Sequence, residues 1–304
     1  MSENAVAQSI KDRLMRRSRA EGLPFNQVFT LFALERLLYR VGTSPYSRQF
    51  VLKGGLMMRA SGAPLARPTR DADLEGFIDS DPRAIERAFQ DIARIPCPED
   101  GVAFHPEGVT ADAIQLDTEY GGVRVKVPGS FGTARFSVQV DIGFGDAITP
   151  GPIRLTYPTW LDHLPGPQLF GYPLETTIAE KYETLFRRRE ANSRAKDWYD
   201  LWMLATTRPF EGPVLQAAIA NTFQQRFRPF EERPDELYRA IAETPSRIAN
   251  WNAFKRTLPH GSAPDELLEL LLVIGAFLDP IMQACREGKR FEGRWDPSSQ
   301  RWSR

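Results

Sequence analysis

The chain has 304 residues, 42% hydrophobic and 26% charged, a composition typical of a globular protein rather than a disordered or fibrous one. Its 39 Lys+Arg residues balance 39 Asp+Glu residues, so any nucleic-acid site must be a local basic patch. The two cysteines, Cys97 and Cys285, and the three histidines are too few and scattered for a disulfide framework or a zinc site. The length suits one large or two modest domains.

The same composition argues against a membrane or secreted protein. No apolar stretch reaches the roughly 20 residues of a membrane span. The N-terminal segment lacks the apolar core of a signal peptide. We therefore expect a cytoplasmic protein with no membrane partner.

In chain order, the first half mixes helical and strand patterns. Apolar residues three and four apart predict helices over residues 4–20, 25–41 and 81–95. The apolar run over residues 50–52 predicts a short buried strand. Period-two alternation predicts strands over residues 114–120, 123–127 and 134–144, with a hairpin turn at Gly121-Gly122. Residues 53–74 follow the first strand and contain a double glycine, a short helical stretch and an acidic pair.

The second half is predicted to be helical. Residues 150–173 are rich in proline and read as a linker between domains. The predicted helices after it cover residues 174–187, 194–205, 212–223, 235–244, 248–258 and 265–286. We expect the polar tail, residues 293–304, to be loosely ordered. The predicted organisation is an α+β domain over residues 1–150 and a helical domain over residues 151–304.

An acidic pair follows the double glycine. Asp71 and Asp73 would project from the same side of a strand, because side chains alternate between its faces. Close carboxylates repel unless they share a proton or bind a cation, and Mg²⁺ prefers oxygen ligands. The turn at Gly54-Gly55 would let phosphates approach the backbone. These features together indicate a site for a metal-bound nucleoside triphosphate; the alternative is an ordinary turn with solvent-exposed acids.

A third acid, Asp141, ends the predicted strand over residues 134–144 on its polar face. It either joins Asp71 and Asp73 from a neighbouring strand or is simply exposed to solvent, and the pattern does not decide between these.

Two charged residues lie near the apolar faces of consecutive predicted helices. Lys181 is three residues after Ile178, and Asp197 is four before Leu201. They could face each other across a cleft, where the lysine would neutralise phosphate. Alternatively, Lys181 extends to solvent and Asp197 caps its helix. The arginine-rich segment between them is either a solvated loop or a contact surface for phosphates.

The order of these motifs resembles the AbiEii/AbiGii-type toxin nucleotidyltransferase family, which includes the MenT-like toxins. The matching segments are Leu52-Lys53-Gly54-Gly55, Arg67-Pro68-Thr69-Arg70-Asp71-Ala72-Asp73, Val140-Asp141-Ile142, Ala179-Glu180-Lys181 and Lys196-Asp197-Trp198-Tyr199-Asp200-Leu201. The resemblance covers residues 25–205. Leu56-Met57-Met58 departs from the small or branched residues usual after the double glycine, which we interpret as a packing variant. Nothing after about residue 210 matches.

The resemblance implies a DNA polymerase β-like nucleotidyltransferase fold, in which a mixed sheet flanked by helices precedes a helical part that completes the active site. It implies that Asp71, Asp73 and Asp141 hold Mg²⁺, with Asp141 alternatively a general base, and that Asp197 is a further essential acid. It places nucleotide binding at Lys53, Gly54, Gly55, Arg67, Thr69 and Lys181.

The implied reaction moves NMP from an NTP onto RNA, at the 3′ acceptor end of tRNA, and blocks translation. A cognate antitoxin is the implied partner. Two alternatives stay open: NMP transfer onto a protein or small molecule, and a non-catalytic module that only binds nucleotide or a partner.

Overall fold

A computed structural model of the chain describes residues 3–62, 69–115, 121–188 and 194–303. The chain forms two compact units, and each is described by itself. Unit 1 comprises Met1–Gly145 and Pro152–Tyr172, and unit 2 comprises Asp146–Gly151 and Pro173–Arg304.

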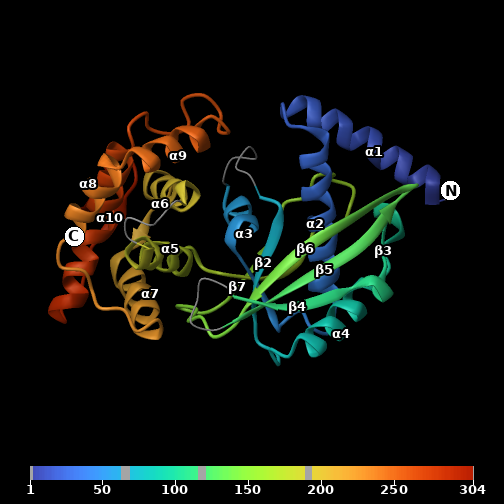
Figure 1. Cartoon of the computed structure of the whole chain (residues 1–304), viewed down its shortest axis with the longest axis horizontal. Coiled ribbons are helices and arrows are strands. Elements are labelled where there is room, and N and C mark those ends of the chain that lie inside the picture. Colours follow the sequence, from blue (N-terminus) through green and yellow to red (C-terminus); the bar gives the residue numbers. More distant parts are fainter. Residues whose placement is uncertain (1–2, 63–68, 116–120, 189–193, 304) are drawn as a thin grey trace. The chain divides into compact units, whose positions relative to one another are not determined.

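Unit 1 is built on one mixed sheet with order β3-β5-β6-β2-β1-β8-β7, and β4 also pairs with β5 (Figure 1). Strand pairs β2–β6 and β1–β8 are parallel, and the other pairs are antiparallel. The strands are β1 (Phe50–Lys53), β2 (Asp71–Gly76), β3 (Val102–Phe104), β4 (Thr110–Ile114), β5 (Gly122–Phe131), β6 (Ala134–Gly143), β7 (Ile153–Thr156) and β8 (Gln168–Gly171). The helices are α1 (Glu3–Ala20), α2 (Phe25–Thr43), α3 (Gly54–Ala60) and α4 (Pro82–Ala93), with short 3₁₀ turns at Pro98–Asp100 and Pro106–Gly108.

The sheet of unit 1 has one apolar face, covered by α2 and α4. Phe50 of β1 packs on Phe89 of α4 with ring centroids 5.3 Å apart, and Phe131 of β5 meets Phe32 of α2 at 6.4 Å. Since side chains alternate along a strand, the residues between these apolar positions point to the opposite face. That opposite face carries the charged residues of the candidate site.

The proline-rich segment was wrongly interpreted as a linker, because it adds two strands to the sheet of unit 1. Strand β8 runs parallel to β1, and β7 pairs with β8 at the sheet edge. The prolines at 150, 152, 158, 165, 167 and 173 all lie outside these strands, where no ladder hydrogen bond is lost. The last passage of the chain from unit 1 to unit 2 therefore follows Tyr172, whereas the predicted domain boundary was at residue 150.

The hairpin is present, but its first strand lies earlier than predicted and its turn is not Gly121-Gly122, because Gly122 already belongs to β5. Its first strand is β4, and Ile114 at the end of β4 pairs with Gly122 at the start of β5. The remaining expected strand residues, 116–120, lie outside the described residues. The strand predicted over residues 134–144 is confirmed as β6.

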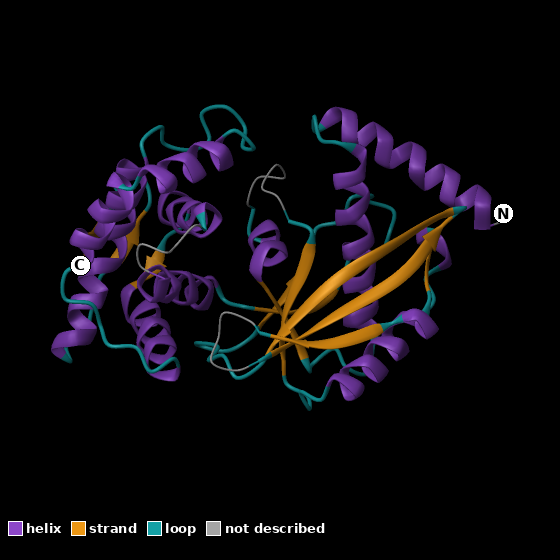
Figure 2. Cartoon of the chain, viewed as in Figure 1, coloured by secondary structure: helices purple, strands orange, loops and turns teal. Residues whose placement is uncertain are grey.

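Unit 2 is mainly helical, and Figure 2 shows its helices with short strands among them. The predicted helices are confirmed, with small shifts at their ends, as α5 (Leu174–Arg188), α6 (Ala195–Thr207), α7 (Gly212–Gln225), α8 (Pro234–Glu243), α9 (Pro245–Lys255) and α10 (Leu267–Glu287). Helix α10 contacts α6, α7 and α8 and buries its apolar stripe against them. Within the described parts of the chain, α10 is the one helix whose length and composition would allow a membrane span; such a helix is weak evidence, because the core helix of a globular protein passes the same test.

The expectation of a loose tail is wrong. Strands β10 (Arg294–Asp296) and β11 (Arg301–Ser303) form a hairpin that pairs with β9 (Phe210–Glu211). Trp295 is fully buried, and its Nε1 donates a hydrogen bond of 2.6 Å to the carbonyl of Ala205. The buried indole supplies the apolar contact that the polar composition of the tail concealed.

Candidate active site

A row of charged residues crosses the polar face of the unit 1 sheet. The pairing of β1 with β2 sets Lys53 opposite Asp73, and the pairing of β2 with β6 sets Asp73 opposite Asp141. The pairing of β5 with β6 then sets Arg124 opposite Asp141. Adjacent strands lie about 4.8 Å apart, so these side chains stand next to one another. Two carboxylates therefore lie at the centre of the row with one cation on each side.

Strand β2 adds further acids to the same face. Asp71 lies two residues before Asp73, and Glu75 lies two residues after it, so all three point to one side of the strand. Burial, followed by repulsion from Asp71 and Asp141, raises the pKa of Asp73 to about 6, against the lowering effect of Lys53. A cation placed here would relieve this repulsion.

The double glycine is in direct contact with Asp73. Gly54 has φ +65°, and a Cβ at this position would lie 1.9 Å from Oδ2 of Asp73. The backbone N–H of Gly55 donates a hydrogen bond to the same carboxylate. The residue at position 54 must therefore be glycine both for its left-handed backbone and for the space that Asp73 occupies.

The carboxylate of Asp141 is held by two side chains of the sheet. Arg124 donates from Nε to Oδ1 and from Nη2 to Oδ2, each at 2.8 Å, in a bidentate ion pair. Gln139 Nε2 lies 3.2 Å from Oδ1 and 3.4 Å from Oδ2. The hydrogen bond with Asp141 raises the pKa of Arg124. Both oxygens of the third acid are thus already engaged.

Lys53 is also engaged at the other end of the row. Its Nζ lies 2.6 Å from Oε2 of Glu75 and sits over the ring of Tyr172, 5.6 Å from the centroid. The hydroxyl of Tyr172 donates to the same Glu75 oxygen at 3.3 Å. Glu75 thereby holds Lys53 next to Asp73. Glu75 was not among the predicted site residues, although its position two residues after Asp73 predicts that it lies on the same face of the strand.

The fit of this face to a divalent cation depends on Arg124. Within the described residues, no group of three or more Asp, Glu, His or Cys side chains is arranged to hold a metal ion. Asp71 and Asp73 are adjacent hard oxygen donors, the type that Mg²⁺ prefers. Asp141 could join them only by releasing the guanidinium that occupies both its oxygens.

The other predicted residues lie in unit 2 or outside this row. Lys181 of α5 forms ion pairs with Asp197 at 2.5 Å and with Asp200 at 2.8 Å, both on α6. Lys181 and Asp197 therefore face each other, but in direct contact and not across a cleft, and their predicted roles stay predictions. Thr69 is half-buried and lies two residues before Asp71. Arg67 lies outside the described residues.

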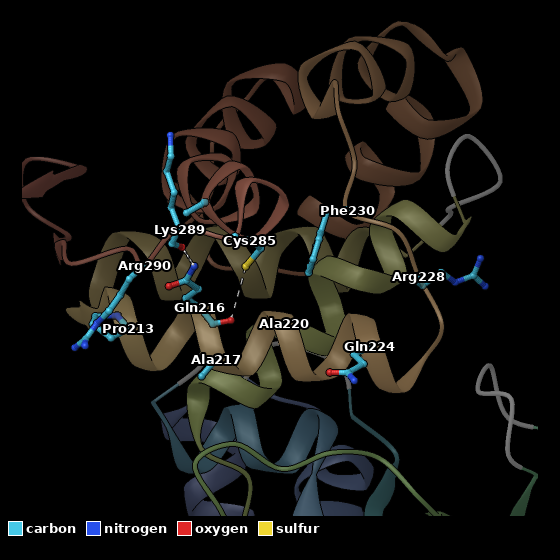
Figure 3. A pocket seen from close by; sticks show the side chains of 12 residues that line it. Pro213, Gln216, Ala217, Ala220, Gln224, Arg228, Phe230, Cys285, Lys289 and Arg290 are labelled. Atoms are coloured by element: carbon cyan, nitrogen blue, oxygen red, sulfur yellow. Dashed lines mark hydrogen bonds between the residues drawn. The ribbon is translucent and has the colours of Figure 1, made fainter.

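Unit 2 also contains an open groove of about 770 Å³ beside α7 and the end of α10 (Figure 3). Gln216, Gln224, Cys285 and Lys289 are among its 12 lining residues, which include no aspartate or glutamate. The groove therefore lacks the carboxylates that the chemistry suggested by unit 1 requires.

A mixed sheet with carboxylates on adjacent strands beside a double glycine defines an α+β protein of the nucleotidyltransferase type. The family described as "Nucleotidyl transferase AbiEii toxin, Type IV TA system" matches residues 36–271, so the chain belongs to this family. Membership implies a nucleoside triphosphate substrate, usually a divalent metal, and a cognate antitoxin.

Two solved structures are similar in fold. One, described as a "putative nucleotidyltransferase from H. pylori", has a TM-score of 0.48 at 15% identity, over 88% of this chain and 100% of its own. The other, JHP933 from Helicobacter pylori, has a TM-score of 0.47 at 15% identity, over 88% of this chain and 94% of its own. No curated protein matches the sequence.

Proposed function

We propose that this protein transfers NMP from an NTP onto the 3′ hydroxyl of RNA, with the tRNA acceptor end as its substrate, and so blocks translation. The observation that carries the proposal is the row in which Asp73 and Asp141 lie side by side, with Asp71 on the same face. Adjacent carboxylates are costly without a cation, and family membership connects them with nucleotidyl transfer.

The carboxylates of Asp71 and Asp73 would hold Mg²⁺, and Asp141 would complete the set or take the proton of the attacking hydroxyl. When bound, the cation would supply positive charge where the attacking and leaving oxygens develop negative charge. Gly54 carries no side chain, which lets the Asp73 carboxylate lie directly against the backbone of the double glycine. Lys53, Gly55, Thr69 and Arg67 would contribute to nucleotide binding around it.

The bond changes are those of an in-line displacement at phosphorus. The 3′ oxygen of the acceptor forms a bond to the α-phosphorus of the NTP. The bond between the α-phosphorus and the oxygen that bridges it to the β-phosphate breaks, and pyrophosphate leaves. The hydroxyl proton passes to a base, for which Asp141 is the proposed residue. Lys181 is proposed to neutralise phosphate charge and Asp197 to serve as the further acid, and the Lys181–Asp197 ion pair would have to open for both roles.

The test is incorporation of label from each α-labelled NTP into total tRNA with Mg²⁺, for wild type and Asp73→Asn. We expect RNase-sensitive label with wild type only. RNase-resistant label on protein would mean that the acceptor is a protein and not RNA. If no NTP gives label in any acceptor and none binds with Mg²⁺ in calorimetry, the protein is a non-catalytic binding module.

The biological setting is proposed with the same site. The protein would act in the cytoplasm as the toxin, and a cognate antitoxin would restrain it. Growth arrest on expression of wild type but not Asp73→Asn would support this setting, and equal growth arrest by both would contradict it.

A further inference from the structure

The Arg124–Asp141 pair occupies the position where the third acid would meet a cation. Arg124 is on β5 and Asp141 on β6, directly opposite each other, and both carboxylate oxygens accept from the guanidinium. A positive group thus already neutralises the acid that the family's chemistry would assign to the metal. Two cations cannot use the same pair of oxygens at full strength.

We propose that Arg124 is an exchangeable counter-ion, which holds Asp141 while the site lacks a divalent cation and releases it when the cation binds. This inference rests on the proposed function for the identity of the cation site. It adds a positioning residue, Arg124, that acts through Asp141.

The exposure of the two side chains fits such an exchange. The side chain of Arg124 is 39% exposed, whereas that of Asp141 is only 10% exposed. The Asp141 carboxylate is therefore enclosed by its neighbours, while the long guanidinium side chain of Arg124 has solvent beside it into which it can rotate. On its other side Arg124 faces Asp112 of β4, an exposed acid that offers the released guanidinium a second neighbour.

The charges of the face also favour exchange over simple addition. Asp71, Asp73, Glu75 and Asp141 carry four negative charges against the two positive charges of Lys53 and Arg124, and Asp112 and Lys126 farther along the face add one charge of each sign. A divalent cation bound among Asp71, Asp73 and Asp141 would supply to Asp141 the positive charge that Arg124 now supplies, so the acid would stay compensated after the guanidinium leaves. The freed guanidinium would then be available to the negative phosphates of the substrate, since arginine binds phosphate through paired N–H groups.

The first experiment measures Mn²⁺ binding by electron paramagnetic resonance of free Mn²⁺, without nucleotide or RNA. Arg124→Gln should tighten Mn²⁺ binding about tenfold, equivalent to about 1.4 kcal/mol, because no guanidinium competes for Asp141. Lys126→Gln is the matched control: it removes one charge from the same face of β5, but Lys126 lies opposite Gln139. The control should change Mn²⁺ affinity less than threefold.

Unchanged or weaker Mn²⁺ binding by Arg124→Gln, or equal tightening by both variants, would overturn the proposal. The same holds if neither wild type nor Arg124→Gln binds Mn²⁺. RNA labelling is measured separately, so a protein that exchanges Arg124 for Mn²⁺ but labels no RNA would sink the proposed function and leave the exchange standing.

A second measurement covers the case in which Arg124→Gln does not fold. The Nε–Hε NMR signal of Arg124 in wild type, assigned as the arginine signal that Arg124→Lys lacks, should shift during titration with diamagnetic Mg²⁺. A signal that stays fixed while other residues of β2 and β6 respond would show that the ion pair persists, against the proposal.

Discussion

Substitution of Gly54 by alanine perturbs the site with a single methyl group. The new Cβ would lie 1.9 Å from Oδ2, 2.6 Å from Cγ and 2.8 Å from Cβ of Asp73. Because all three Asp73 atoms are too close, rotation of the carboxylate tip alone cannot relieve the clash, and the whole side chain or the backbone must move. Asp73 would also lose its alignment with the Gly55 N–H.

The structure provides a control with the same backbone angle. Gly22 also has φ +65°, and a Cβ there would meet nothing within 4 Å. Both variants incur the left-handed backbone cost of about 1–2 kcal/mol. Gly54→Ala should lose a further ~1.5–3 kcal/mol, because a hydrogen bond to a carboxylate is disrupted. Displacement of a reacting geometry by about 1 Å can lower a rate 100-fold, so transfer activity should fall at least that far in Gly54→Ala alone.

The assay combines denaturant unfolding of both variants with label incorporation into RNA and Mn²⁺ binding. Gly22→Ala should show only the modest loss of stability and near wild-type activity. The reasoning is refuted if Gly54→Ala retains Mn²⁺ binding and more than half of wild-type transfer, or if Gly22→Ala loses activity to the same extent.

Three further substitutions test other parts of the structure. Lys181→Ala leaves the fully buried Asp200 without this partner, so unfolding should become about 3–5 kcal/mol easier, and adding Asp200→Asn should recover most of the loss; additive losses would contradict this. Burial raises the pKa of Asp279 from 3.8 to about 6, so its stabilising contribution is complete below pH 3.8 and lost as the pH rises through 6. From pH 4.5 to pH 7, wild type should therefore lose about 2 kcal/mol more unfolding free energy than Asp279→Asn does. The same pH dependence in both proteins would refute the raised pKa of Asp279. Trp295→Ala should cost about 3–5 kcal/mol, whereas Arg301→Ala in the same hairpin should change stability by less than ~0.5 kcal/mol; a mild effect of both would mean that the tail is not packed.

Local patterns in the sequence predicted most elements of both units. The helices of unit 2 carry apolar stripes of helical period, and β6 alternates cleanly, so each could be read within its own segment. The two strands among the prolines could not, since β7 and β8 span only four residues each, and β8 depends on β1 for pairing while β7 depends on β8. The hairpin at the C-terminus was missed for the same reason, because Trp295 becomes a core residue only through contacts with residues far away in the chain, such as Phe277.

The candidate site shows the same limit. The alternation of β2 placed Asp71 and Asp73 on one face, and the sequence raised Asp141 as a third acid without deciding its position. The register between β2 and β6, which sets Asp73 beside Asp141, is a property of the sheet and not of either strand. Arg124 lay in an alternating strand among valines, but its partner could be known only from the β5–β6 register.

The central claim is most directly tested by nucleotide transfer to tRNA whose 3′ end is either free or oxidised with periodate. Purified protein is incubated with Mg²⁺ and each labelled NTP, and the labelled RNA is digested to locate the added nucleotide. If the sheet face around Asp73 catalyses transfer to the 3′ hydroxyl, free tRNA gains label at its 3′ end, while oxidised tRNA and the Asp73→Asn reaction gain none. Equal labelling of oxidised tRNA, or undiminished labelling by Asp73→Asn, would contradict it.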